Sequence, residues 1–137
     1  MESAKFSFDN HIFTDFEIHT QNATDELTLQ LHPNGVFDAE NKVFSLQIDF
    51  RIMSENNEPE NLFVAVRCLA KFTFEETVRN LNEIPDYFYA NSIAIVYPYL
   101  RAFVSTLTIQ SNTRPIVLPI MNLTTLGKDL EKNTRIL

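Results

Sequence analysis

The sequence has little of several residue types that define common classes of protein site. It contains one cysteine, Cys68, which excludes an internal disulfide and a cysteine-rich metal site. Its two glycines, Gly35 and Gly127, are too few for the glycine-rich loops that bind phosphates in nucleotide enzymes. Basic residues are also scarce, because 11 Lys and Arg stand against 18 Asp and Glu, a net charge of −7. We therefore expect no nucleic-acid partner, since non-specific binding to phosphates depends on basic side chains.

Long uncharged runs are absent as well. The longest extends from Tyr87 to Leu100, and its 14 residues fall short of the roughly 20 that a membrane-spanning helix needs. Residues 1–11 have no apolar run with a small-residue cleavage site, so no signal peptide is expected. A length of 137 residues fits one domain. The expectation is a single soluble domain, residues 1–137, in the cytoplasm, with no membrane insertion.

The first half of the chain alternates apolar and polar residues with a period of two, which predicts strands with one buried face. The cluster Pro33-Asn34-Gly35 predicts a turn after the second strand, because Asn and Gly tolerate the positive φ of tight turns. The fourth segment carries Phe63, Ala65 and Leu69 on its second face and is predicted to be apolar on both faces. Strands are expected at about residues 5–20, 26–32, 42–53 and 62–75.

The second half changes to a helical period. Apolar residues recur at i, i+3, i+4 and i+7 from Ile93 to Leu107, which predicts a helix over about 91–111. An extended apolar link, Ile116 to Leu118, lies between two prolines, and a second helix is expected at about 122–133. The predicted class is α+β, with four strands followed by a helix, an extended link and a helix.

Catalytic and metal-binding patterns are weak in this sequence. His11 and His19 are eight residues apart on one predicted strand, roughly 26 Å at about 3.3 Å per residue, too far to share a metal ion. His32 is expected at the surface beside a turn. Cys68 lies on the apolar face of its strand, which favours a buried core thiol over a nucleophile. We therefore expect neither an enzyme nor a cofactor.

The motifs of the second half resemble those of a known family. Tyr97-Pro98-Tyr99-Leu100-Arg101 is followed by the segment from Pro115 to Leu123 (PIVLPIMNL) and by Leu126. This order is similar to the aromatic-Pro-Tyr-x-Arg helix and the Pro…Leu-x-Pro-Val-Asn-Phe link of SecB, the protein-export chaperone. The resemblance covers nearly the whole chain in element order, and individual residues match from about Ile95 to Leu126.

The resemblance implies a four-stranded antiparallel sheet packed with two helices, assembled as a dimer of dimers into a homotetramer. It implies an ATP-independent holdase with no cofactor, which binds unfolded preproteins in apolar grooves and passes them to the translocation ATPase SecA. Asp15 matches one of the acids that bind SecA in the family and is a candidate contact. The other two acid positions hold His19 and Ala65. These departures leave open a role in guarding the antitoxin of a toxin–antitoxin system.

Candidate site residues follow from these arguments. The side chains expected to line the polypeptide-binding groove are Phe63, Phe74, Leu81, Ile84, Tyr87, Phe88 and Ile95. Val64, Val66 and Cys68 are expected at the subunit interface. A second hypothesis is a carrier of a small apolar ligand, in which the aromatic residues would enclose one pocket.

Overall fold

The computed structural model describes residues 5–54 and 58–137. Short 3₁₀ turns precede β2, β4 and α1 at Thr20–Asn22, Pro59–Asn61 and Leu81–Glu83. The strands and helices, in chain order, are β1 (Phe6–Ile18), β2 (Leu27–Asp38), β3 (Val43–Ser54), β4 (Leu62–Phe74), α1 (Asp86–Gln110), α2 (Leu123–Lys132) and β5 (Thr134–Ile136). The α+β class with two helices is confirmed.

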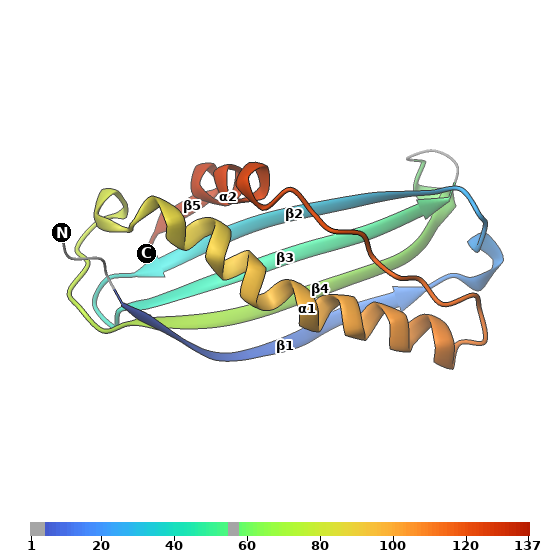
Figure 1. Ribbon diagram of the computed structural model, residues 1–137, viewed down its shortest axis with the longest axis horizontal. Coiled ribbons are helices and arrows are strands. Elements are labelled where there is room, and N and C mark those ends of the chain that lie inside the picture. The colour runs from blue at the N-terminus through green and yellow to red at the C-terminus, as the bar shows by residue number, and fades with distance from the viewer. Residues whose placement is uncertain (1–4, 55–57) are drawn as a thin grey trace.

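The sheet has five strands rather than the four that were expected, and it is mixed rather than antiparallel. Its strand order is β1-β4-β3-β2-β5. The first four strands pair antiparallel, and β5 pairs parallel with Gly35–Phe37 of β2. Three residues are too few to show any hydrophobic period, so β5 leaves no signal in the sequence. Figure 1 shows β5 beside β2, directly after α2.

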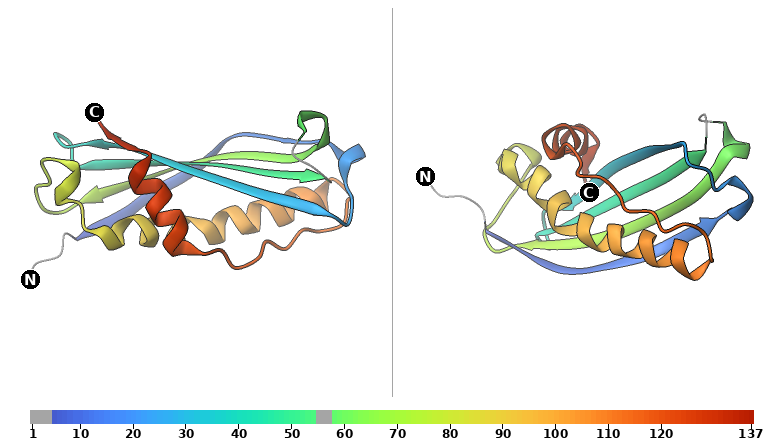
Figure 2. Two further views of the ribbon diagram at one scale, coloured as in Figure 1. Left: turned by 90° about the horizontal axis from the view of Figure 1, so that it is seen from above. Right: turned by 45° about the vertical axis from the view of Figure 1, so that its right-hand side comes forward.

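The helices and the link all lie on one face of the sheet (Figure 2, left). Alternate residues of each strand point to this helix-side face, and the others point to the uncovered face, which we call the open face. On β4 the even-numbered residues from Val64 to Phe74 are buried on the helix side. The open face of β4 carries Arg67 and Lys71, both exposed. The expectation that β4 is apolar on both faces is therefore wrong.

Phe63 departs from this alternation for a local reason. The pairing of β3 with β4 shifts between Ile52 and Met53, which leaves Phe63 as an extra residue at the shift. Such a bulge redirects a side chain without ending the strand. Phe63 is buried beside the link.

The turn expected at Pro33-Asn34-Gly35 is also wrong, because β2 runs through all three residues. The Pro33 carbonyl accepts a hydrogen bond from Asn133 Nδ2 on the outer side of β2, away from β3. The proline nitrogen faces the same side, so the ladder to β3 loses no donor. The chain reverses after Asp38 instead, where Lys42 has φ 61° and Asp38 accepts two hydrogen bonds from Asn41.

Helix α1 begins five residues before the expected start, at Asp86, and it continues through Pro98 to Gln110. A proline inside a helix costs about 3 kcal/mol or more, since it removes one backbone hydrogen bond. Burial of Phe88, Ile93 and Val96 against the sheet offsets this cost, and the same burial brings the aromatic segment before Asn91 into the helix.

Both glycines of the chain lie where its C-terminal unit, formed by α2 and β5, packs closely against the rest of the fold. A Cβ on Gly127 would lie 2.9 Å from the backbone nitrogen of Ala90, so glycine lets α2 approach α1 closely. A Cβ on Gly35 would lie 2.4 Å from the Phe44 ring and 2.9 Å from Thr134 Oγ1. Glycine at these two positions therefore lets α2 approach α1 and β5 approach β2 closely.

Candidate functional site

The link between the helices, residues 114–122, is an extended segment whose backbone is fixed to α1. Tyr97 Oη donates a hydrogen bond to the Pro119 carbonyl at 2.6 Å, and Ser105 Oγ donates to the Ile116 carbonyl at 2.7 Å. The Ile116 amide donates to Thr108 Oγ1 at 3.1 Å. Burial raises the pKa of the Tyr97 phenol, which keeps it a donor at neutral pH. The link therefore has a defined path without belonging to a helix or strand.

The fixed link presents apolar side chains to solvent. Leu118 is fully buried, whereas Val117 is 69% and Ile120 is 95% exposed. A single exposed aliphatic residue is common on protein surfaces, but two on one hydrogen-bonded extended segment form a local apolar surface. Neither residue was among the predicted groove residues. The signal available in the sequence was an apolar stretch between Pro115 and Pro119 with no period that would bury it.

A pocket opens where the link leaves α1, and we call it the link pocket. It has a volume of about 330 Å³ and has both an apolar and a polar part. Asp25 and Arg114 form an ion pair between two exposed side chains, so water can compete with it. The lining residues are Ala23, Thr24, Asp25, Leu27, Phe63, Arg114, Pro115 and Ile116. Such a pocket suits one apolar side chain, with the ion pair beside it.

The structure does not bring the predicted groove residues together. Phe63 lines the link pocket at the start of β4. Phe74 and Phe88 pack against each other at 4.9 Å between ring centroids, at the opposite end of β4, and both are buried. Ile84 is buried as well, so the assignment of Phe74, Ile84 and Phe88 to a binding surface is corrected to the core. A period-two pattern shows which residues share a face and says nothing of what covers it.

The remaining groove candidates lie near the surface. Leu81 and Ile95 are half-buried and Tyr87 is exposed. None of the three lines the link pocket. Their assignment to a polypeptide-binding groove stays a prediction, and such a groove would lie apart from the link pocket.

The predicted interface residues Val64, Val66 and Cys68 lie within the chain's own core. They are on the helix side of β4, paired with β1 and β3, and all three are buried. Burial raises the pKa of the Cys68 thiol to about 11. This corrects the interface assignment, because the helices and the link already cover this face of the sheet.

The exposed apolar surface lies instead at the β1 edge, where α1 passes over it. Phe16 and Tyr99 are exposed there, whereas Ile12, which is also exposed, pairs with Leu69 and lies on the open face of β1. The rings of Phe13 and Phe103 stack at 4.2 Å between centroids, and Phe16 meets Phe103 at 5.0 Å. His11 stacks on Tyr99 at 4.3 Å between ring centroids, and this histidine is half-buried. We call Phe16, Tyr99 and Phe103 the β1-edge patch.

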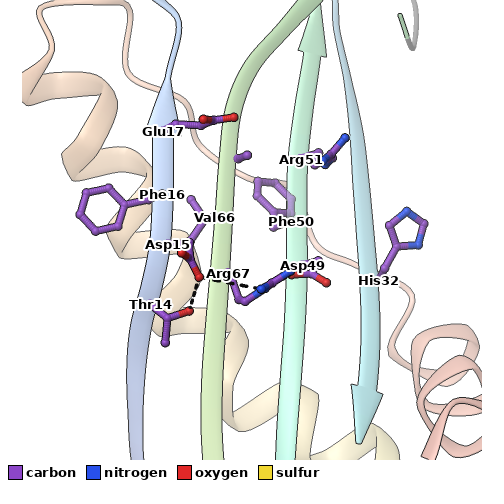
Figure 3. A pocket seen from close by; sticks show the side chains of 11 residues that line it. Thr14, Asp15, Phe16, Glu17, His32, Asp49, Phe50, Arg51, Val66 and Arg67 are labelled. Atoms are coloured by element: carbon purple, nitrogen blue, oxygen red, sulfur yellow. Dashed lines mark hydrogen bonds and ion pairs between the residues drawn. The ribbon is translucent and has the colours of Figure 1, made fainter. Parts of the chain in front are cut away.

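The open face carries a larger and more polar hollow of about 870 Å³ (Figure 3). Arg67 Nε donates to Asp49 Oδ1 at 2.8 Å, and its Nη1 lies 3.9 Å from Asp15 Oδ2. Thr14 and Gln47 donate to the same two carboxylates. Asp15 is thus at the open face, as a contact to a basic partner would require, but Arg67 already lies beside it.

Metal ligands do not converge in the part of the chain that the structure describes. No group of three or more His, Cys, Asp or Glu side chains there could hold a metal ion. His19 Nε2 lies 3.6 Å from Glu17 Oε1, and His32 lines the open-face hollow. The described side chains offer binding surfaces, with a local apolar surface on the link.

Helix α1 is long and apolar enough to cross a membrane by length and composition alone, and 39% of its most apolar window is buried. The uncharged run in the sequence, Tyr87 to Leu100, is shorter than the helix, because Asp86 and Arg101 lie inside α1 and bound the run. The helix packs across the sheet in this chain, and core helices of soluble proteins pass the same test.

No protein-family model matches this chain. An uncharacterized protein of Methanocaldococcus jannaschii, MJ0357, is 26% identical over an alignment of 117 residues, and the match covers 72% of this chain and 76% of that protein. A protein of unknown function from Streptococcus agalactiae has a TM-score of 0.50 and 12% identity, covering 87% of this chain and 100% of the other.

A solved structure with a described role matches better. It is Mycobacterium tuberculosis Rv1957, a SecB-like chaperone in complex with a ChAD peptide from the Rv1956 HigA1 antitoxin. The TM-score is 0.69 at 17% identity, and the match covers 85% of this chain and 88% of the other. The resemblance drawn from the sequence is therefore confirmed at the level of the fold: this chain has the fold of a SecB-like chaperone.

Proposed function

We propose that this chain is an ATP-independent holdase of the SecB-like family that binds unfolded polypeptides along the link. The observation that carries the proposal is the exposure of Val117 and Ile120 on a segment whose backbone is fixed to α1. Apolar side chains held outward in this way can contact any extended chain, whatever its sequence. The SecB-like fold of the chain supports a chaperone role in general.

In this proposal an unfolded client lies along the link in an extended conformation. Its apolar side chains contact Val117 and Ile120, and one of them enters the link pocket beside Phe63. Each contact is weak, and several together hold the client through effective concentration. Because only the unfolded client binds, its folding is delayed by mass action, and no nucleotide is required.

We further propose that the chain works in the cytoplasm as a homotetramer, a dimer of dimers. The β1-edge patch supports this, because β1 is the outer strand of the sheet and exposes Phe16 beside α1. Two copies related by a twofold axis would cover the patch symmetrically. The outer side of α1, away from the sheet, would supply the second contact.

For the destination of the client, we propose an antitoxin rather than the export ATPase. The SecB-like neighbour is bound to an antitoxin peptide. The acid retained for an ATPase contact, Asp15, lies 3.9 Å from Arg67. A basic partner would have to compete with this guanidinium, and the family's other two acid positions hold His19 and Ala65. Both observations favour the antitoxin role over delivery to SecA.

The holdase proposal is tested by light scattering of a chemically unfolded protein diluted into buffer with and without this chain. Suppression of aggregation without ATP is the expected result. The double variant Val117→Ser/Ile120→Ser should lose most of the suppression. The matched control is Ile109→Ser, which removes an exposed aliphatic side chain from the last turn of α1, outside the link.

Two other results would contradict the proposal. Equal suppression by the double variant and the parent would remove the link from the binding site. Absence of suppression together with saturable 1:1 binding of a fatty acid would favour the carrier of a small apolar ligand. For the destination, an antitoxin-derived peptide should bind the parent chain and SecA should not, and the reverse result would restore the export role.

A further inference from the structure

The last strand, β5, pairs only weakly with the outer edge of β2. It has three residues and pairs parallel with β2, an arrangement slightly less stable per residue than antiparallel pairing. Its side chains bury little, since Ile136 is 44% and Leu137 is 76% exposed. We call Thr134–Leu137 the C-terminal strap.

The edge under the strap is nevertheless shaped to accept a strand. The Gly35 amide donates to the Asn133 carbonyl at 3.3 Å, and the Leu137 amide donates to the Phe37 carbonyl at 2.8 Å. Gly35 has no side chain that would block Thr134. Thr134 Oγ1 donates to the Leu130 carbonyl at 2.6 Å, which ties the start of the strap to α2. The fit shows that this edge takes an extended segment through backbone hydrogen bonds.

The strap covers only one part of a longer edge. β2 has twelve residues, and within the described chain Leu27–Asn34 pairs with β3 alone. Leu27 also lines the link pocket, so the unpaired part of the edge begins at the proposed binding site. Release of the strap, together with the Asn133 contacts to Pro33 and Gly35, would open the outer edge of β2 from Leu27 to Asp38, with a donor missing at Pro33.

Release of the strap would leave the rest of the C-terminal unit in place. α2 is anchored independently by buried Leu130 and by Gly127 against the backbone of Ala90. Short exposed segments with few buried contacts open locally at low free energy. The strap can therefore leave β2 without unfolding the helix.

We propose that the C-terminal strap is an autoinhibitory contact, which an extended client displaces from the β2 edge as it binds. This inference rests on the proposed function, because it assumes that the chain binds extended polypeptides. The strap then sets a minimum length for the client segment. Segments with enough extended chain to pair along β2 displace the strap, and shorter segments do not.

The test locks the strap in the full chain. Val36 and Arg135 are direct partners in the β2–β5 register, and adjacent strands place their Cα atoms at a separation that a disulfide can bridge. The double variant Val36→Cys/Arg135→Cys is prepared in an oxidised and a reduced form, and the binding of the two forms is compared. Buried Cys68 does not compete, because a raised thiol pKa disfavours the reactive thiolate. The probe is fluorescein-labelled lactalbumin, reduced and carboxymethylated so that it stays unfolded.

The oxidised form should bind the probe about fivefold more weakly than the reduced form, or weaker still. Ser45→Cys/Lys71→Cys, which cross-links paired residues of β3 and β4 away from the β2 edge, should show no such difference. Truncation after Asn133 should tighten binding, and amide exchange at Leu137 in the parent chain should accelerate when the probe is added.

The outcomes separate the two proposals. Equal binding by the oxidised and reduced forms, with Leu137 exchange unchanged, would overturn the strap and leave the holdase intact. Failure of the parent chain and of both redox forms to bind the probe would overturn the proposed function, and the strap with it.

Discussion

The two faces of the sheet differ in how tightly their side chains depend on one another. On the helix side, aromatic rings from four strands, β1 to β4, and from α1 meet edge to face, as Phe44 does with Phe88 at 4.8 Å between centroids. On the open face, Arg67, Asp15 and Asp49 interact through exposed or half-exposed charges. Close packing transmits any change of volume, whereas solvated charges rearrange at little cost. Stability should therefore depend on the helix side, and the open face should tolerate substitution.

The sharpest test of this difference uses two neighbouring residues. Val66→Asp places a carboxylate on the buried side of β4, and Ala65→Asp places the same group on the open face. A buried, unpaired charge should cost at least about 3 kcal/mol, while the open-face change should cost little. Urea unfolding followed by circular dichroism measures both. Similar midpoints for the two variants would mean that the faces do not differ as described.

A smaller effect on stability is expected at the close contact between α2 and α1. Gly127→Ala adds a methyl group 2.9–3.0 Å from the backbone of Ala90, which cannot move aside without shifting α1. Overpacking of about 1–3 kcal/mol should exceed the helix-propensity gain of about 1 kcal/mol. The unfolding free energy should therefore fall by about 1 kcal/mol. Thr125→Ala, on the exposed side of α2, serves as the control, and a stabilised Gly127→Ala variant would contradict the close contact.

The helix-side core should also weaken at alkaline pH. Burial raises the pKa of Cys68 from 9.0 to about 11, so the thiol stays protonated in the folded chain while it ionises in the unfolded chain. The stabilisation is complete below pH 9 and is lost as the pH rises towards 11. From pH 9 to 10 the loss should be about 1 kcal/mol, at 1.36 kcal/mol per pKa unit. Cys68→Ala should show a shallower pH dependence of the urea midpoint, and an unchanged dependence would exclude the thiol as its source.

The smallest effect is expected at Arg67. Arg67→Gln removes the cation between Asp15 and Asp49, which leaves two carboxylates unpaired on the open face. The urea midpoint should scarcely change, because exposed ion pairs contribute little to stability. Binding of a basic peptide should instead increase at low salt, since both acids become available. A basic peptide that binds parent and variant equally would show that Arg67 does not mask the acids.

The sequence predicted those parts of the fold that depend on local pattern. The alternation from Phe44 to Ile52 located β3 to within a few residues, because one face of that strand is buried along its whole length. Pro33 and Gly35 were misinterpreted because their tertiary environment, an outer edge that accepts β5, reverses their usual meaning as turn residues. The start of α1 was missed for a similar reason, since burial of Phe88 and Tyr89 selects the helix there.

The candidate site was less accessible to sequence analysis. Phe74 and Phe88 belong to the core, and Val117 and Ile120 reach solvent, yet all four are apolar residues and the sequence around them does not show which are covered. What separates them is the path of the link, which depends on hydrogen bonds from Tyr97 and Ser105 across 22 and 11 residues. Such pairings have no local signature.

Those same hydrogen bonds bear on affinity. A binding segment that is disordered beforehand loses conformational entropy when it closes on a ligand, by about 0.5–1.5 kcal/mol for each immobilised side chain. The link takes its extended shape during folding, through Tyr97, Ser105 and Thr108, before any ligand is present. Whatever docks against Val117 and Ile120 therefore meets a preorganised surface, and the ordering that remains at binding falls on the ligand alone.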